Sequence, residues 1–246
     1  MSVQFERVSF SYPGRPPVLA GFDLTVEAGE VVAIVGRSGA GKTTILKLVN
    51  RLLLPSSGAV VVHGRDTRAW DGIQLRRRSG YVFQDVGLFP HLSVEDNVRV
   101  VPTLQGWTNE RAHARALELL DMVGLPPAQF ATRAPAELSG GQRQRVGLAR
   151  ALAADPEVLL MDEPFGALDP VTRAEVRRAF SALQARLGTT AILVTHDMGE
   201  AFSLGRRVAV LDAGQMVICD TPVAVARSQD SRVRAFLDAL PPIPGA

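Results

Sequence analysis

The sequence predicts an α/β protein whose sheet is mainly parallel. From about residue 30 onward, short runs rich in valine and isoleucine alternate with amphipathic segments of helical length. This alternation is typical of parallel strands that are covered by helices. The chain has 246 residues, of which 46% are hydrophobic, and a chain of that length buries roughly 70–75% of the surface that it exposes when unfolded. We therefore expect a large apolar core.

The predicted elements begin with two short strands, at residues 3–12 and 18–26. The connection between them is too short for a crossover helix, so the two strands are expected to be antiparallel and to form a side sheet. Residues 31–35 are a continuous apolar run, as expected of a central strand that is buried on both faces. After a glycine-rich turn, apolar residues recur at helical spacing as far as Leu53 and predict a helix that stops before Pro55.

The middle third of the chain, residues 84–157, has no convincing strand pattern and is predicted to be a helical insertion. We expect a polar stretch as far as Gly106, and then helices at residues 108–123 and 139–153. The insertion therefore interrupts the strand–helix pattern that precedes it.

Strands resume after the insertion. The later predicted elements are strands at 158–161, 190–195 and 208–211, a helix whose apolar face is Val176, Phe180, Leu183 and Leu187, and a last helix at 233–240. The predicted organisation is a single domain, residues 1–246, with a core of residues 1–83 and 158–246 and the insertion at 84–157.

Composition excludes several classes of protein. The chain holds 27 basic and 25 acidic residues, and a net charge of +2 is too small to indicate a nucleic-acid-binding surface. Apolar runs extend for only a handful of residues, whereas a membrane-spanning helix needs about 20. The first residues lack a secretory signal pattern and the single Cys219 cannot form an internal disulfide, so we expect a reducing cytosol. Three consecutive arginines, residues 76–78, are interpreted as a solvated turn.

A glycine-rich motif between the strand at 31–35 and the following helix carries the clearest chemistry. Its residues, which match the phosphate-binding pattern G-x-x-x-x-G-K-[ST], are Gly36, Arg37, Ser38, Gly39, Ala40, Gly41, Lys42 and Thr43. Glycines let the backbone wrap closely around phosphate oxygens, so that N–H groups and the helix N-terminus point at the anion. We expect Lys42 to contact the β- and γ-phosphates, Thr43 to offer a hydroxyl to Mg²⁺, and Thr44 to belong to the same nucleotide site.

A second motif supplies carboxylates at the end of a strand. The apolar residues 158–161 lead to Asp162 and Glu163, and a parallel sheet delivers such residues to its C-terminal edge, beside the phosphate-binding loop. Asp162 suits Mg²⁺ and its waters. Glu163 would not bind the metal and could orient or deprotonate a water that attacks the γ-phosphate. The pair therefore predicts hydrolysis rather than binding alone.

The lysine count narrows the class of nucleotide-binding protein. Of the 27 basic residues, 25 are arginine and only Lys42 and Lys47 are lysine. Lys47 lies between two leucines, so an Asn-Lys-x-Asp element is impossible and a small GTPase is excluded. A second potential anion site opens the helix at 139–153, because hydroxyl and glycine N–H groups gather at its N-terminus. Its residues are Leu138, Ser139, Gly140, Gly141 and Gln142.

With these motifs in order, the chain resembles the ATP-binding-cassette family of transport ATPases over residues 3–240. The matching positions are residues 138–142 for the family signature, Gln84 for the glutamine loop, residues 166–169 for the loop after the carboxylates, His196 for the switch histidine and Tyr12 for the aromatic ring against adenine. The resemblance implies ATP binding and hydrolysis to ADP and phosphate.

The resemblance also implies that two copies of the chain enclose two ATP molecules. Lys42, Gln84, Glu163 and His196 would be the catalytic residues within one copy, and Thr43, Gln84 and Asp162 would hold Mg²⁺. The residues that would contact the ATP of the other copy are Ser139, Gly140, Gly141 and Gln142. ATP binding would close the dimer and hydrolysis would let it reopen.

Membrane partners follow from the same resemblance. The chain would lie on the cytoplasmic face of the cell membrane, bound to separate permease subunits and indirectly to a solute-binding protein, with no nucleic acid. Residues 85–91 are where the family docks a helix of the permease, so Leu88 and Phe89 are expected to offer an apolar contact. The alternative is that these two side chains pack into the chain's own core.

The solute is suggested only by local sequence. Residues 87–91, 165–173 and 195–198, among others, look like bacterial importers of glycine betaine, choline and related quaternary amines. The alternatives are an importer of amino acids or sulfonates, an exporter, and a cassette ATPase that acts on nucleic acid or ribosomes. Members of the osmoprotectant group often carry a paired regulatory domain, and since the sequence stops at Ala246 we do not expect sensing through one. Gly199 stands where the resemblance leads us to expect an acidic residue.

Overall fold

The computed structural model describes residues 2–239 of the chain. These residues divide into two units, one built from residues 2–72 and 191–239 and the other from residues 73–190. The subdomain boundaries expected from the sequence, at 83/84 and 157/158, both fall inside the second unit. The expected division into core and insertion stays a prediction.

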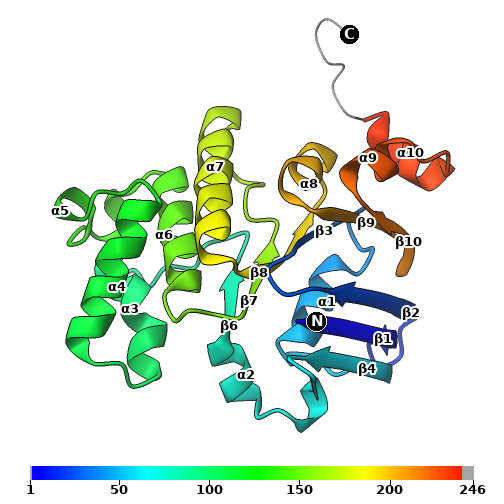
Figure 1. The fold of residues 1–246 in the computed structure, drawn as a ribbon, viewed down its shortest axis with the longest axis horizontal. Helices are drawn as coiled ribbons and strands as arrows, with labels where there is room; N and C mark the ends of the chain where they lie inside the picture. Colours follow the sequence, from blue (N-terminus) through cyan, green and yellow to red (C-terminus); the bar gives the residue numbers. More distant parts are fainter. Residues whose placement is uncertain (1, 240–246) are drawn as a thin grey trace, which may run out of the picture. The chain divides into compact units, whose positions relative to one another are not determined.

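An antiparallel side sheet opens the first unit. Strands β1 (Val3–Ser11) and β2 (Pro17–Val26) are antiparallel, as the short connection between them predicts. Two strands that were not expected, β4 (Ser57–Val62) and β5 (Arg65–Asp66), extend the sheet in the order β2-β1-β4-β5. Figure 1 shows β1, β2 and β4 side by side.

The parallel strands of the first unit place β3 between two neighbours. β3 (Val31–Gly36) pairs in parallel with β8 (Thr190–Thr195) and with β9 (Arg207–Asp212), while β10 (Gln215–Asp220) is antiparallel to β9. Every residue of β3 and β8 is buried. The continuous apolar run at 31–35 is therefore a central strand, and the predicted α/β class is confirmed.

Helix α1 is shorter than the sequence predicts. The helices of this unit are α1 (Lys42–Val49), α8 (Met198–Leu204), α9 (Pro222–Ala226) and α10 (Ser231–Leu237). The Asn50 side chain accepts a hydrogen bond from the Leu52 N–H at 3.2 Å, and Arg51 has a φ of 55°, which ends the helix. Leu52 is consequently 52% exposed. The last predicted helix is α10, and residue 240, its expected end, lies outside the described residues.

The second unit contains a parallel strand pair and a group of helices. The pair is β6 (Ser79–Val82) and β7 (Val158–Asp162). The helices are α2 (Gly72–Arg78), α3 (Val94–Leu104), α4 (Asn109–Met122), α5 (Pro127–Phe130), α6 (Gly140–Leu152) and α7 (Pro170–Leu187). α3, α4 and α6 pack on one another and α7 packs on α6, as can be followed in Figure 1. The helices predicted at 108–123 and 139–153 are confirmed as α4 and α6.

Two predictions in this unit are wrong. α3 lies within the expected polar stretch, where it begins after Ser93, whose Oγ accepts a hydrogen bond from the Asp96 N–H at 3.0 Å. Its helical pattern is obscured because buried Asn97 and Pro102 occupy positions where the sequence rule looks for apolar helix formers. The arginines at 76–78 form the last turn of α2 rather than a turn outside any helix, and positive charge is favourable at a helix C-terminus.

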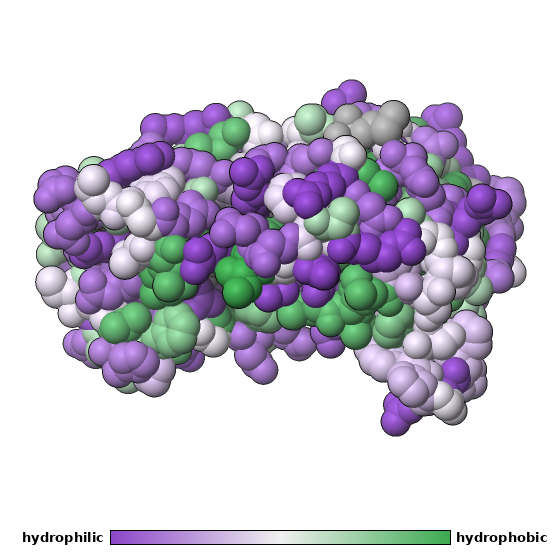
Figure 2. Space-filling model, turned by 90° about the horizontal axis from the view of Figure 1, so that it is seen from below, coloured by the Kyte–Doolittle hydropathy of each residue, from purple (hydrophilic) through white to green (hydrophobic). Residues whose placement is uncertain are grey.

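Exposed apolar side chains are dispersed over both units. The large ones are Leu52, Leu54, Ile73, Phe83, Phe89, Leu104, Val171 and Val223. Figure 2 shows a face that is mainly hydrophilic and is interrupted by small hydrophobic patches. Within residues 2–239, no helix combines the length and the apolar character that a membrane span requires.

Candidate nucleotide-binding site

The predicted phosphate-binding loop joins β3 to α1. Gly41, the N-cap of α1, has a φ of 104°, and a Cβ atom there would lie 2.9 Å from the Leu19 side chain and 3.0 Å from the Val18 carbonyl oxygen. Only glycine satisfies both the backbone angle and the lack of space. The loop can therefore end directly at the N-terminus of α1, where backbone N–H groups and the helix dipole attract anions.

Lys42 is held inside this loop. Its Nζ donates hydrogen bonds to the carbonyl oxygens of Gly36 at 2.7 Å and Arg37 at 3.2 Å, and the residue is only 6% exposed. Thr43 is half-buried and Thr44 is buried. A compact ammonium thus lies among the backbone groups of the loop, while Arg37, Ser38 and Gly39 are exposed.

His196 follows the strand next to the loop. Val35 and Thr195 are register partners in the parallel pair of β3 and β8, so the loop and His196 leave the sheet at the same edge. The Thr195 hydroxyl donates to Glu200 Oε2 at 2.7 Å and accepts a hydrogen bond from the Asp197 N–H at 3.0 Å. These two bonds fix the backbone on both sides of the exposed His196. Sequence reasoning missed Glu200, which is 2% exposed, because nothing local marks it as a partner of Thr195.

Tyr12 lies directly after β1, in the same unit as the loop. Its ring makes an edge-to-face contact with Phe10, with centroids 4.9 Å apart and planes at 85°. Phe10 is the register partner of Leu19, whose side chain is a close neighbour of Gly41. β1 and β2 therefore connect the proposed adenine contact to the glycine that ends the loop.

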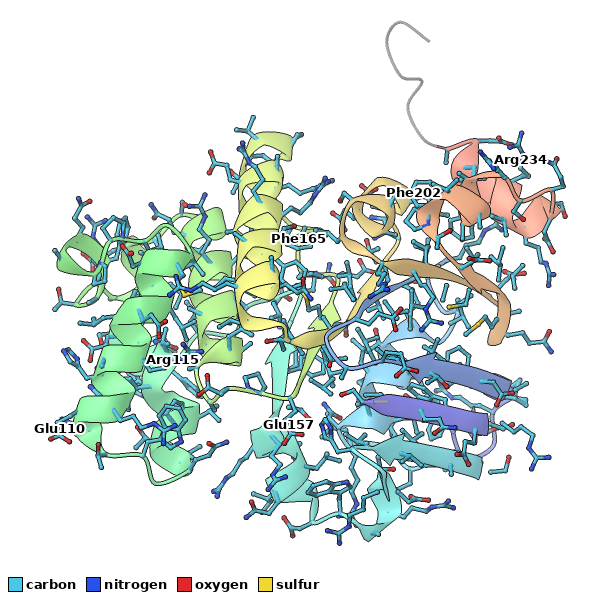
Figure 3. All side chains as sticks on the ribbon, in the orientation of Figure 1. Glu110, Arg115, Glu157, Phe165, Phe202 and Arg234 are labelled. Atoms are coloured by element: carbon cyan, nitrogen blue, oxygen red, sulfur yellow. The ribbon has the colours of Figure 1, made fainter. Side chains whose placement is uncertain are left out.

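In the second unit, Gln84 and Glu163 meet around one glycine. Val82 and Met161 are register partners in the parallel pair of β6 and β7, so the two segments leave the sheet at the same edge. A Cβ atom placed on Gly166 would lie 3.8 Å from Glu163 Oε2 and 3.9 Å from Gln84 Nε2. Gly166 also donates its N–H to the Glu163 carbonyl at 3.2 Å. Phe165, labelled in Figure 3, is 1% exposed and anchors this turn in the core.

The backbone of Glu163 is strained. Its φ is 46°, in the left-handed region that a residue with a side chain adopts at a cost of about 1–3 kcal/mol. Such strain persists only where the surrounding structure enforces it, and it is concentrated at functional sites. β7 ends at Asp162, so Glu163 is the first residue after the strand.

Asp162 has a partner that the sequence did not indicate. The Tyr81 hydroxyl donates a hydrogen bond to Asp162 Oδ2 at 3.2 Å. Burial, the charge of Asp162 and this bond all raise the pKa of Tyr81 above its ordinary value, so the hydroxyl remains a donor. The Tyr81 ring stacks on Phe83 at 4.2 Å. The two bonded residues are 81 positions apart in the chain, and only the pairing of β6 with β7 brings them together.

The signature residues form the N-terminus of α6. Ser139 Oγ accepts a hydrogen bond from the Gln142 N–H at 3.2 Å, and Gln142 Oε1 accepts one from the Ser139 N–H at 2.9 Å. This reciprocal capping box fixes both side chains at the helix end. Gly141 packs against the Thr172 side chain, and the Thr172 N–H donates to Asp169 at the start of α7. The loop at 166–169 and the signature are thus joined through α7.

The residues expected to hold Mg²⁺ offer oxygen atoms of the kind that the ion prefers. Thr43 supplies a hydroxyl, Gln84 an amide oxygen and Asp162 a carboxylate. Among residues 2–239 there is no cluster of three or more His, Cys, Asp or Glu side chains that could enclose a metal. A donor set with one carboxylate fits Mg²⁺, which commonly keeps waters and binds through one or two carboxylates and the phosphates of a substrate.

A glycine-rich loop with an internal lysine, a strained carboxylate at a strand end and a capped helix N-terminus define a P-loop nucleotide-binding protein. The chain belongs to the ABC transporter family, whose model matches residues 19–166. The family expected from the sequence motifs is thereby confirmed.

Several relatives of known role are similar to the chain. It is 50% identical over 200 residues to the osmoprotectant import ATP-binding protein OsmV of Salmonella typhimurium. This match covers 81% of this chain and 52% of that protein. It is 45% identical to the glycine betaine/carnitine/choline transport ATP-binding protein OpuCA of Bacillus subtilis, over 92% of this chain and 59% of that protein. The chain therefore spans between half and three fifths of the length of these relatives.

A solved structure shows the same fold. The bacterial ABC transporter cassette MJ0796, solved as a dimer, matches with a TM-score of 0.79 and 34% identity, over 89% of this chain and 98% of that chain. The predicted P-loop fold with a mainly parallel sheet is confirmed by this likeness.

Proposed function

We propose that this chain is the ATP-hydrolysing subunit of an importer of quaternary-amine solutes. The hydrolytic part of the proposal rests on Gln84 and Glu163, whose side chains meet around Gly166 at the ends of a parallel strand pair. The import part rests on the similarity to proteins named for osmoprotectant, glycine betaine, carnitine and choline transport.

The first unit supplies the proposed contacts with ATP. Tyr12 stacks on the adenine, and the N–H groups from Gly36 to Thr44 surround the phosphates. On binding, the Lys42 ammonium exchanges its bonds to the Gly36 and Arg37 carbonyls for bonds to the β- and γ-phosphate oxygens. The hydrogen bond between Asp197 and Thr195 fixes the backbone around His196, whose side chain is proposed to act beside the γ-phosphate.

The second unit supplies the proposed chemistry. The Glu163 carboxylate accepts a hydrogen bond from the attacking water and aligns it with the γ-phosphate, so that ATP and water give ADP and phosphate. Mg²⁺, when bound, neutralises charge on the phosphate oxygens; Thr43, Gln84 and Asp162 are its proposed ligands. The bond from Tyr81 holds the Asp162 carboxylate in one orientation.

The signature is proposed to act across a dimer of two copies. The capping box fixes Ser139 and Gln142 at the N-terminus of α6, where the helix dipole favours a γ-phosphate. Gly140 and Gly141 contribute backbone N–H groups beside them. The dimeric form of the MJ0796 cassette, which has 34% identity to this chain, supports such an assembly.

A permease is proposed to dock beside the Gln84 loop, at the cytoplasmic face of the membrane. A cavity of about 300 Å³ lies here, lined by Tyr81, Phe83, Phe89, Val100, Val101 and Arg150, among others. Phe89 is 41% exposed and Leu88 is half-buried. The exposure of Phe89 favours this contact over the alternative that Leu88 and Phe89 both pack into the chain's own core. A partner with an apolar side chain and an acidic group would complement this lining. A solute-binding protein would act indirectly, through the permease.

Transport by a reconstituted complex tests the proposal. The membrane protein that co-purifies with the tagged chain is inserted with it into proteoliposomes, and uptake of labelled glycine betaine and choline is measured with ATP present. We expect ATP-dependent uptake that ceases with the Glu163→Gln variant. Hydrolysis without uptake of either solute would overturn the proposed solute class, and capture of nucleic acid or ribosomes in place of a membrane protein would overturn transport.

A further inference from the structure

The loop between β6 and α3, residues 83–93, is attached to two different helices. It carries Gln84 and Phe89, the residues proposed above for catalysis and for permease contact. It contains no helix or strand of its own, so its shape depends on the side chains that reach it from outside. Those side chains come from α6 and α3.

Arg150 of α6 binds the first half of this loop. Its Nη2 donates to the Val86 carbonyl at 2.6 Å and its Nη1 donates to the Gly87 carbonyl at 2.8 Å. Burial lowers the pKa of Arg150 from its ordinary high value, but a guanidinium remains charged at any physiological pH. The same guanidinium lies 5.9 Å from the centre of the Phe89 ring. A single planar group therefore holds two successive peptides and borders the exposed aromatic side chain.

Gly147, one turn earlier in α6, lies in close contact with the Val86 side chain of the same loop. A Cβ atom at Gly147 would lie 2.3 Å from Val86 Cγ1, which is too close for two non-bonded carbon atoms, so Val86 would have to shift. Alanine is the better helix former by about 1 kcal/mol, so glycine at this mid-helix position indicates a need for close contact. Val86 is thus fixed twice, through its side chain by Gly147 and through its carbonyl by Arg150.

Asn97 of α3 binds the second half of the loop. Its Oδ1 accepts a hydrogen bond from the Phe89 N–H at 2.7 Å, and its Nδ2 donates to the carbonyls of Phe89, Leu92 and Ser93 at 2.9–3.2 Å. Asn97 is fully buried. Since α3 packs against α6, the loop and the two helices form one connected piece of structure.

We propose that Gly147 and Arg150 clamp the loop to α6, so that the signature end of this helix and the Phe89 contact move as one body. Ser139 and Arg150 are separated by 11 residues, or about 16 Å along a helix that rises 1.5 Å per residue. Arg150 is a positioning residue: it sets where Gln84 and Phe89 lie relative to the helix. The roles of the signature and of Phe89 rest on the proposed function, whereas the attachment of the loop to α6 rests on the contacts that Arg150 and Gly147 make with it.

Hydrogen exchange of the nucleotide-free chain tests the clamp directly. In Arg150→Gln, which loses both bonds, we expect amide exchange in residues 85–92 to rise at least about tenfold, and Arg150→Lys should restore part of the protection. Gly147→Ala should raise the same exchange while leaving α6 intact, because the substitution favours the helix. The matched control is Arg145→Gln, since Arg145 lies on the same helix and binds Glu175 and the Val123 carbonyl instead. Exchange in 85–92 that is equal in Arg150→Gln and the parent would overturn the clamp.

A second measurement separates positioning from simple stability. In the Glu163→Gln background, ATP should alter exchange both in the signature, residues 139–143, and in residues 85–92. With Arg150→Gln added, the signature response should persist and the loop response should disappear, whereas Arg145→Gln should keep both. A loop that still responds to ATP in Arg150→Gln would overturn the inference. Failure of the signature to respond in any variant would instead overturn the proposed dimer contact, and the nucleotide-free exchange would still decide the clamp.

Discussion

Replacing Lys42 by arginine is the sharpest test of the phosphate-binding loop. The ammonium donates two hydrogen bonds, at 2.7 and 3.2 Å, to carbonyls of its own loop and is 6% exposed. A guanidinium is longer, planar and broader, so it cannot place its donors at the same point within a space of this size. We expect Lys42→Arg to fold but to lose the two charge-assisted bonds that Lys42 would make to phosphate.

The expected magnitude follows from those two bonds. A hydrogen bond to a charged group contributes about 1.5 kcal/mol at the lower end of its range, so two of them amount to about 3 kcal/mol. At about 1.4 kcal/mol per tenfold, the rate of ATP hydrolysis should fall at least about 100-fold. Lys47→Arg is the matched control, because Lys47 lies on the same helix, five residues later, and is partly exposed.

Phosphate release at saturating ATP measures the effect, with thermal melting as a check that both variants are folded. We expect near-parental hydrolysis for Lys47→Arg and a loss of at least about 100-fold for Lys42→Arg. If Lys42→Arg retained hydrolysis within about threefold of the parent, the role assigned to the ammonium would be wrong.

Three further predictions concern residues that the motifs do not mark. Tyr81→Phe removes the bond to Asp162 and keeps the ring, so the Mg²⁺ concentration for half-maximal hydrolysis should rise several-fold; a magnesium titration that superimposes on the parent would refute this. Asn97→Ala loses four bonds at a fully buried site, and we expect a loss of about 3 kcal/mol and a Tm lower by roughly 6–12 °C in calorimetry. Burial tends to raise the pKa of Glu30, but the hydrogen bonds from Arg207 and from the Glu27 N–H, together with the charge of Arg207, outweigh burial and lower that pKa below 4.5. The stability that Glu30 contributes is therefore full above pH 4.5 and is lost as pH falls through the lowered pKa. Urea unfolding should therefore show the parent to be more stable than Glu30→Gln at pH 7, with the difference shrinking toward pH 3; a constant difference would contradict the linkage.

The sequence predicts those elements whose signals are local. The buried strand before Gly36, the capped helix after Ser139 and the apolar face of α7 are each encoded within a few consecutive turns or residues, and the structure contains all three. The end of α1 was missed because apolar spacing continues past Val49 while Asn50 and the residues after it form a turn.

The rest of the candidate site depends on contacts between distant parts of the chain. Tyr81 reaches Asp162, and Arg150 reaches Val86, only because strands and helices far apart in sequence pack together. α3 was missed for a related reason: Asn97 is buried because it binds the preceding loop, so a polar residue stands where an apolar one would mark the helix. Residue patterns predict which groups carry the chemistry, while the partners that orient these groups come from the packing.

The Glu163→Gln variant tests whether this chain hydrolyses ATP with Glu163 in an assembly of two copies. The measurement combines ATP binding, light scattering of the chain with ATP and Mg²⁺, and phosphate release. We expect retained ATP binding, a dimer that forms with ATP and persists, and hydrolysis reduced by at least about 100-fold. Hydrolysis equal to that of the parent would contradict the assignment of Glu163, and a chain that binds ATP but stays monomeric would contradict the assembly.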